Sequence, residues 1–245
     1  MIHHEQPRLV FVHIPKTAGT SIEVMLARQL CGVAHPDELD KRTRIGMHLP
    51  VRGIDGQHAN YREYALQGPQ TGYFRFSVVR HPLVRAVSQV AYLRKGDAGM
   101  QFFRGRCWKD WLMKLASTRR AMIWGHDLGA CQVDYLIDSE GRLAMDFIGR
   151  FEQLDAAWET ICARLGFAAP PPLPHILKGP GVDLDGCFDE ESKAALVAKY
   201  ARDFTTFGYS EELPGPVEAN ADGPGCAAVH GLVERQAVKD SGAGV

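Results

Sequence analysis

The chain of 245 residues lacks the features that mark several large classes of protein. No apolar run approaches the roughly 20 residues needed to cross a bilayer, so we expect no membrane span. The 28 basic and 29 acidic residues give a net charge of −1. Nucleic-acid-binding surfaces are usually dominated by basic residues that contact phosphates, so we expect no nucleic-acid partner. Any basic binding cleft is therefore local.

Closely spaced cysteine pairs are also missing. The six cysteines are scattered along the chain without a C-x-x-C pair, so we expect no metal site. The first residues, MIHHEQPRLVFV, lack the basic flank and apolar core of a secretory signal. These observations predict a cytoplasmic protein whose thiols stay reduced and mostly serve as small core residues.

Short apolar runs followed by helical spacing predict the fold. Residues 9–12 and 74–79 are apolar enough for buried strands, and helices are expected after them at 21–31 and 83–93. Repeated strand–helix units favour an α/β fold with a mostly parallel sheet flanked by helices. We expect a single domain over residues 1–210.

The later elements are less regular. We expect an amphipathic helix from Trp108, a hairpin formed by residues 133–137 and 143–147, and a final helix near 190–203. The apolar face of residues 154–165 predicts another helix, which Gly166 ends. Residues 211–245 are rich in Pro, Gly, Ala and Asp without apolar periodicity, and we expect a disordered or loosely packed tail.

Residues 9–21, LVFVHIPKTAGTS, carry the strongest functional signal. A strand, a tight loop and a helix direct several backbone N–H groups at one point, where the helix dipole favours an anion. Lys16 adds a positive charge, and three hydroxyls add donors that suit phosphate oxygens. The alternative is that Thr20 or Ser21 caps the helix. Capping explains one hydroxyl but not the lysine and the others.

The order of residues in this loop differs from that of a nucleotide triphosphatase. The P-loop of those enzymes reads G-x-x-x-x-G-K-[ST], with a hydroxyl on magnesium. Here Lys16 precedes Gly19, and no glycine occupies the first position of that pattern. The loop therefore predicts a terminal phosphate bound without the usual magnesium geometry.

Three segments together resemble one enzyme family. HIPKTAGTS resembles the 5′-phosphosulfate loop of sulfotransferases that use 3′-phosphoadenosine 5′-phosphosulfate (PAPS), in the carbohydrate branch. Residues 74–88, FRFSVVRHPLVRAVS, are similar to the family's 3′-phosphate segment, and residues 146–152, DFIGRFE, match bacterial members. The resemblance covers about residues 8–210. It implies a P-loop-like fold and sulfuryl transfer from PAPS, without a metal, to a hydroxyl of a carbohydrate, glycolipid or other glycoconjugate.

The resemblance also implies roles for individual residues. Lys16 would stabilise the leaving oxygen, and Arg80 with Ser88 would hold the 3′-phosphate. The 5′-phosphosulfate would be held by Lys16, Thr17, Gly19, Thr20 and Ser21. His81 stands where the family often has Asn, and Arg85 is expected to be a solvated helix residue.

The attacking hydroxyl needs a general base, and histidine titrates in a suitable range. His58, in GQHANYRE, resembles the family's histidine between the two phosphate motifs, and His48 is the second candidate. We expect His13 to support the loop and His81 to pack behind Pro82. Residues 35–72 and 95–130 are expected to shape the acceptor pocket.

Two other functions stay open at this stage. A non-catalytic module could bind 3′-phosphoadenosine 5′-phosphate (PAP) or another nucleotide with the same motifs. A P-loop kinase would need ATP and magnesium, and the missing Walker spacing counts against it.

Overall fold

The computed structural model describes residues 1–32, 58–66, 71–95, 107–118, 122–123, 126–127, 129–168, 173 and 184–214. The described chain divides into two compact units. The first unit is drawn from residues 1–79 and 135–176, and the second from residues 80–134 and 177–221. The predicted tail falls almost entirely outside the described residues.

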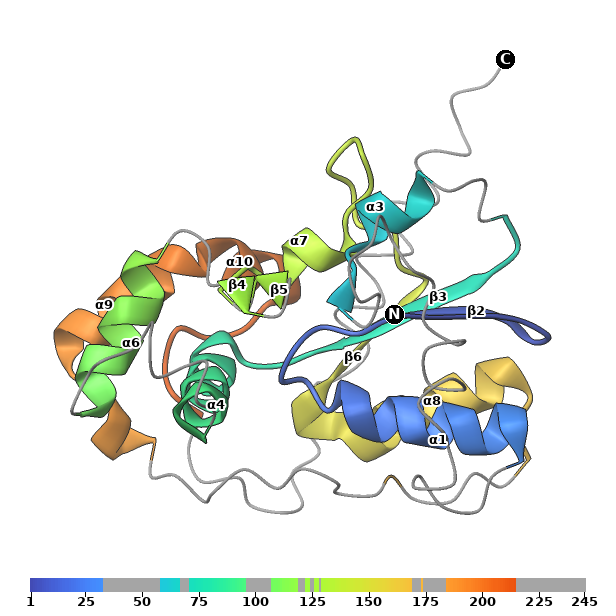
Figure 1. Ribbon diagram of the computed structural model, residues 1–245, viewed down its shortest axis with the longest axis horizontal. Helices are drawn as coiled ribbons and strands as arrows, with labels where there is room; N and C mark the ends of the chain where they lie inside the picture. The colour runs from blue at the N-terminus through green and yellow to red at the C-terminus, as the bar shows by residue number, and fades with distance from the viewer. Residues whose placement is uncertain are drawn as a thin grey trace. The chain divides into compact units, whose positions relative to one another are not determined.

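The first unit contains a four-stranded sheet in the order β1-β2-β3-β6 (Figure 1). Strands β2, β3 and β6 are parallel, and β1 pairs antiparallel with β2. This arrangement confirms the predicted α/β fold with a mostly parallel sheet. The strands are β1 (Ile2–Glu5), β2 (Arg8–Val12), β3 (Phe74–Val79) and β6 (Phe147–Arg150).

Helices cover both faces of this sheet. Helices α1 (Gly19–Cys31) and α8 (Leu154–Leu165) lie against one face, and α3 (Tyr61–Ala65) lies on the other side (Figure 1). A short 3-10 helix, η3 (Phe151–Gln153), leads from β6 into α8. As predicted, α8 ends at Gly166, whose φ of 72° is in the left-handed region.

Apolar side chains on the strands and on α1 and α8 form the core of the first unit. Each fully buried large apolar side chain contributes roughly 1.5–3 kcal/mol relative to exposure. A Cβ at position 149 would lie 2.6 Å from the Cβ of Ala157, so the close approach of α8 to β6 requires glycine there. The core includes Leu9, Phe11, Ile22, Leu26, Phe76, Phe147, Trp158 and Ile161.

The second unit is mainly helical. Helices α4 (Pro82–Lys95), α6 (Trp108–Ser117) and α9 (Glu190–Lys199) share an apolar core that includes Leu83, Val87, Val90, Trp111, Leu112, Leu115 and Leu196. This confirms the predicted helices at 83–93 and from Trp108. This unit also contains β4 (Met122–Ile123), β5 (His126–Asp127), η4 (Asp185–Cys187) and α10 (Ala201–Phe207).

The hairpin predicted at residues 133–147 is largely wrong. Residues Val133–Leu136 form a short helix, α7. The carboxylate of Asp203 accepts hydrogen bonds from the N–H groups of Gln132 and Val133, at 2.8 and 3.0 Å, and satisfies donors that a helix start leaves without partners. Only one antiparallel bridge, between Ile137 and Leu143, remains of the hairpin.

The predicted final helix is broken and longer than expected. Helix α9 ends at Lys199, and Tyr200 has φ −101° and ψ 19°, outside the helical range. The chain then continues as α10 to Phe207. The Tyr200 side chain, at the break between the two helices, is fully buried in the core of this unit.

Two further expectations concern cysteines and membranes. Cys162 and Cys187 are buried as small core residues, whereas Cys107 is exposed. Within the described ranges, no helix is both long and apolar enough to cross a bilayer.

Candidate functional site

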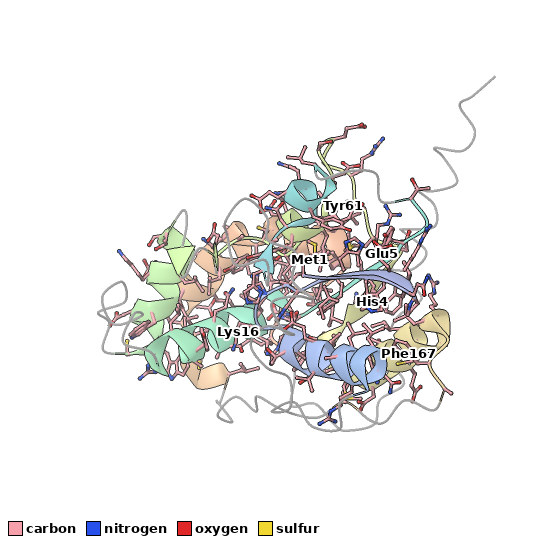
Figure 2. The ribbon with its side chains drawn as sticks, turned by 45° about the vertical axis from the view of Figure 1, so that its right-hand side comes forward. Met1, His4, Glu5, Lys16, Tyr61 and Phe167 are labelled. Atoms are coloured by element: carbon pink, nitrogen blue, oxygen red, sulfur yellow. The ribbon has the colours of Figure 1, made fainter. Side chains whose placement is uncertain are left out.

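The loop between β2 and α1 has an unusual backbone. Lys16 and Ala18 have φ values of 70° and 64°, which are uncommon for residues other than glycine. Strained residues of this kind cluster at functional sites, and alternation between backbone regions turns successive N–H groups toward one concave surface that suits an anion. Figure 2 shows Lys16 in this loop, at the N-terminal end of α1. The loop and the dipole of a 13-residue helix thus favour the same kind of ligand.

The hydroxyl groups of the loop have different roles. Ala18 is the N-cap of α1, and its carbonyl accepts from the N–H of Ser21 at 2.9 Å, without a capping side chain. The alternative that Thr20 or Ser21 caps the helix is therefore wrong, because both lie in its first turn. Thr17 is buried, and its hydroxyl donates to the carbonyl of Ile14 at 2.9 Å. The side chain of Thr17 thus holds the loop together.

A buried pair of side chains, His13 and Glu23, supports this loop. Nδ1 of His13 lies 2.8 Å from Oε1 of Glu23, and both side chains are nearly inaccessible. A Cβ at position 19 would overlap the Cδ2 and Nε2 atoms of His13. The imidazole can occupy its place only because residue 19 is glycine. The expectation that His13 supports the loop agrees with these contacts.

His58 lies next to the same loop. Its Nδ1 is 3.0 Å from the carbonyl oxygen of His13, and the two imidazole rings are 4.3 Å apart at 70°. Because a carbonyl only accepts, Nδ1 must carry the proton, and Nε2 is then the nitrogen of the neutral ring that can accept one. Asn60 caps α3 just after it, accepting from the N–H of Glu63 at 2.9 Å. His48, the second candidate base, lies outside the described residues.

Arg80 directly follows the last residue of β3 and belongs to the second unit. Its N–H donates to Oε1 of Gln132, and its carbonyl accepts from Nε2 of Gln132, both at 2.8 Å. The Arg80 side chain is partly exposed, as is Ser88 on α4. Sequence reasoning missed Gln132, because no motif surrounds it.

The predicted site residues thus fall into two groups. Lys16, Thr17, Gly19, Thr20, Ser21 and His58 are close neighbours within the first unit, through the loop and the His13 carbonyl. Arg80 and Ser88 belong to the second unit.

Arg85 differs most from its prediction. We expected a solvated side chain, but Arg85 is fully buried, and its Nη1 donates to the carbonyl of Ala130 at 3.0 Å. Its guanidinium also lies over the ring of Tyr200, 5.9 Å from the centroid. Burial raises the pKa of Asp203, while the positive charge of Arg85 acts in the opposite direction. A buried cation and a buried carboxylate therefore sit within mutual electrostatic reach.

His81 is buried beside Arg80. Its Nε2 lies 3.0 Å from the carbonyl oxygens of both Ser210 and Glu212, so this nitrogen donates to the backbone. The ring also makes edge contacts with Phe204 and Tyr209. His81 therefore attaches the segment after α10 to the start of α4.

Comparison with known proteins gives one match. No curated protein and no solved structure shows significant similarity to the chain. A model described as the Sulfotransferase family matches residues 1–210, which include the Lys16 loop, His58 and the Arg80 segment. The matched region is most of the chain. The protein therefore belongs to the sulfotransferase family and is a PAPS-dependent sulfotransferase.

Proposed function

We propose that this sulfotransferase transfers the sulfuryl group of PAPS to a hydroxyl of a sugar or glycoconjugate, with His58 as the general base. The observation that carries the proposal is the hydrogen bond between His58 and the carbonyl of His13, which holds a base beside the Lys16 loop. The carbohydrate acceptor is supported by the resemblance of HIPKTAGTS to the carbohydrate branch.

The loop residues suit the 5′ end of the donor. The first N–H groups of a helix have no partner within the helix, and here they belong to Gly19 and Thr20, because the N–H of Ser21 donates to the Ala18 carbonyl. The Lys16 ammonium supplies a full positive charge, and Thr20 is partly exposed. Thr17 contributes through its backbone, because its hydroxyl donates to Ile14. When bound, PAPS supplies an activated sulfuryl group on a phosphate.

Arg80 and Ser88 suit the 3′ end of the donor. Arginine binds phosphate through two parallel N–H groups, and the hydroxyl of serine can add a donor. Ser88 lies at the end of the second turn of α4. The helix begins at Pro82, two residues after Arg80. We propose that these two residues hold the 3′-phosphate.

The chemistry follows from charge and proton movements. Negative charge grows on the leaving oxygen during transfer, and a positioned Lys16 ammonium stabilises it. The acceptor hydroxyl loses its proton to Nε2 of His58, and the imidazole becomes a cation. The Nδ1–H group keeps donating to the His13 carbonyl, which orients the ring in both states.

The test combines calorimetry with PAP and transfer assays with labelled PAPS and a panel of sugar acceptors. Lys16→Ala should reduce the transfer rate by about 10²- to 10³-fold. His58→Ala should reduce turnover by about 10²- to 10⁴-fold and leave the affinity for PAP unchanged. His4→Ala, at a β1 position outside the loop, is the control and should transfer normally.

Three results would contradict parts of the proposal. Absence of PAP binding by the folded chain would refute the donor site. Normal turnover in His58→Ala would move the base to another histidine, such as His48. Transfer to non-carbohydrate hydroxyls alone would refute the acceptor class.

A further inference from the structure

Gln132 holds the backbone of Arg80 with both ends of its side-chain amide. Oε1 accepts from the Arg80 N–H and Nε2 donates to the Arg80 carbonyl, each at 2.8 Å. We call this pair of bonds the Gln132 clamp. A planar amide that bonds to both polar groups of one residue fixes the orientation of that residue, as a neighbouring strand would.

The clamp is needed where it occurs. The ladder between β3 and β6 ends with Val79 opposite Arg150, so Arg80 is the first residue beyond the sheet pairing. Gln132 takes over the role of a strand partner at that point. Because the arginine side chain is long, a small rotation of the Arg80 backbone moves its guanidinium by a large distance.

A buried carboxylate holds the clamp itself. Oδ2 of Asp203 accepts from the backbone N–H of Gln132 at 2.8 Å and lies 3.4 Å from its Nε2. Oδ1 accepts from the N–H of Val133 at 3.0 Å. Gln132 and Asp203 are both fully buried, and so is Arg85, whose charge acts on Asp203. The contacts run from Asp203 through Gln132 to Arg80, all within the second unit.

From this arrangement we propose that Gln132 is a positioning residue that sets the preference for a 3′-phosphorylated adenine nucleotide, acting through Arg80. The inference rests on the proposed role of Arg80 at the 3′-phosphate. A neutral amide suits the task, because it offers one donor and one acceptor without competing for the guanidinium. A carboxylate at position 132 would lack the donor and would lie beside Asp203.

The test compares the affinities for PAP and for adenosine 5′-phosphate, which lacks the 3′-phosphate. The intact protein should prefer PAP, and Arg80→Ala should abolish most of that preference. Gln132→Met keeps the length and apolar volume of the side chain but breaks the clamp. It should reduce the preference about tenfold by weakening PAP binding, while the affinity for adenosine 5′-phosphate stays the same.

Two further variants separate positioning from folding. Gln132→Asn keeps an amide, but its side chain is too short to reach both backbone groups of Arg80. It should therefore lose the preference for PAP to the same extent, and it provides the test if Gln132→Met does not fold. Gln89→Met changes another fully buried glutamine of the second unit and should keep the preference. Urea unfolding measures the stability of each variant.

The outcomes are distinguishable. If the intact protein does not prefer PAP, or Arg80→Ala retains the preference, the proposed role of Arg80 is wrong. If Arg80→Ala loses the preference and both Gln132 variants keep it, the positioning role is wrong. An equal loss of affinity for PAP and for adenosine 5′-phosphate in the Gln132 variants would also overturn the positioning role, because that pattern indicates a structural role only.

Discussion

The two segments proposed to hold the donor begin alike and are stabilised differently. The loop of residues 13–21 follows β2, and the segment of residues 80–88 follows its parallel neighbour β3. Contacts within the loop join residues close in sequence: Thr17 with Ile14 three residues away, and His13 with Glu23 ten residues away. The backbone of Arg80 is instead held by Gln132, which lies 52 residues further along the chain. Gln132 is in turn held by Asp203, another 71 residues further along.

The two proposed phosphate-binding segments therefore depend on different kinds of contact. The loop carries most of its own supports within one motif, so its shape depends on a short stretch of chain. The Arg80 segment depends on tertiary contacts, so changes in distant helices should reach it. Substitutions that break one region and spare the other test the comparison.

The largest effect is expected from Gly19→Ala. The new Cβ would overlap the His13 ring, which is buried and held by Glu23. Overpacking of this kind costs about 3 kcal/mol in a rigid site, and PAP binding should be lost. Urea unfolding and calorimetry measure both. The double variant with His13→Ala removes the obstructing ring and should recover part of the stability. Additive losses in the double variant would contradict the local explanation.

A smaller effect is expected from Asp203→Asn. The amide nitrogen would face one of the two N–H groups that now donate to the carboxylate, and a buried donor without a partner costs about 2 kcal/mol. The preference for PAP over adenosine 5′-phosphate should fall. The affinity for adenosine 5′-phosphate should not change, because the Lys16 loop keeps its own supports. A fall in both affinities would show that the two regions are not independent.

Thr17→Val should cost less, about 1 kcal/mol, because it removes one hydrogen bond and keeps the shape of the side chain. Affinity for PAP and for adenosine 5′-phosphate should fall together, since the change acts on the 5′ end. Thr17→Ser, which retains the hydroxyl, serves as the control for both measurements. Selective loss of the 3′-phosphate preference would contradict the separation of the two sites.

The smallest effect is expected at Asp189, the N-cap of α9 in the second unit. Hydrogen bonds from Lys109, and then from Ser192, lower the pKa of its carboxyl group. A carboxyl group whose pKa is lowered in the folded state stabilises the protein at any pH above its unfolded-state pKa of about 3.9. This stabilisation is lost as the pH falls through the folded-state pKa. Asp189→Asn keeps a good cap. It should therefore be slightly less stable than the parent at pH 7, with the difference shrinking below about pH 4. PAP binding should not change; a weaker affinity would link α9 to the site.

Local sequence patterns predicted the regions that are stabilised locally. The apolar runs of β2 and β3, and the order of Lys16 and Gly19, lie within short windows and were interpreted correctly as strands and a loop. The strand predicted at residues 133–137 is wrong for residues 133–136, which form a helix. The sequence pattern could not show this, because the carboxylate that satisfies the first N–H groups of the helix belongs to Asp203, 70 residues away. The prediction that Arg85 is solvated failed for the same reason, because the groups that it contacts come from other parts of the chain. Gln132 lies in no recognisable motif, so its contacts with Arg80 could be found only from the structure.

The bonds of His81 have a consequence for how this family member can vary. They contact the main-chain carbonyls of residues 210 and 212 rather than their side chains. The residues at those two positions can therefore change without disturbing these bonds, whereas an insertion or deletion between Phe204 and Ser210 would displace both acceptors. Among homologues, the length of this segment should therefore vary less than its amino-acid sequence.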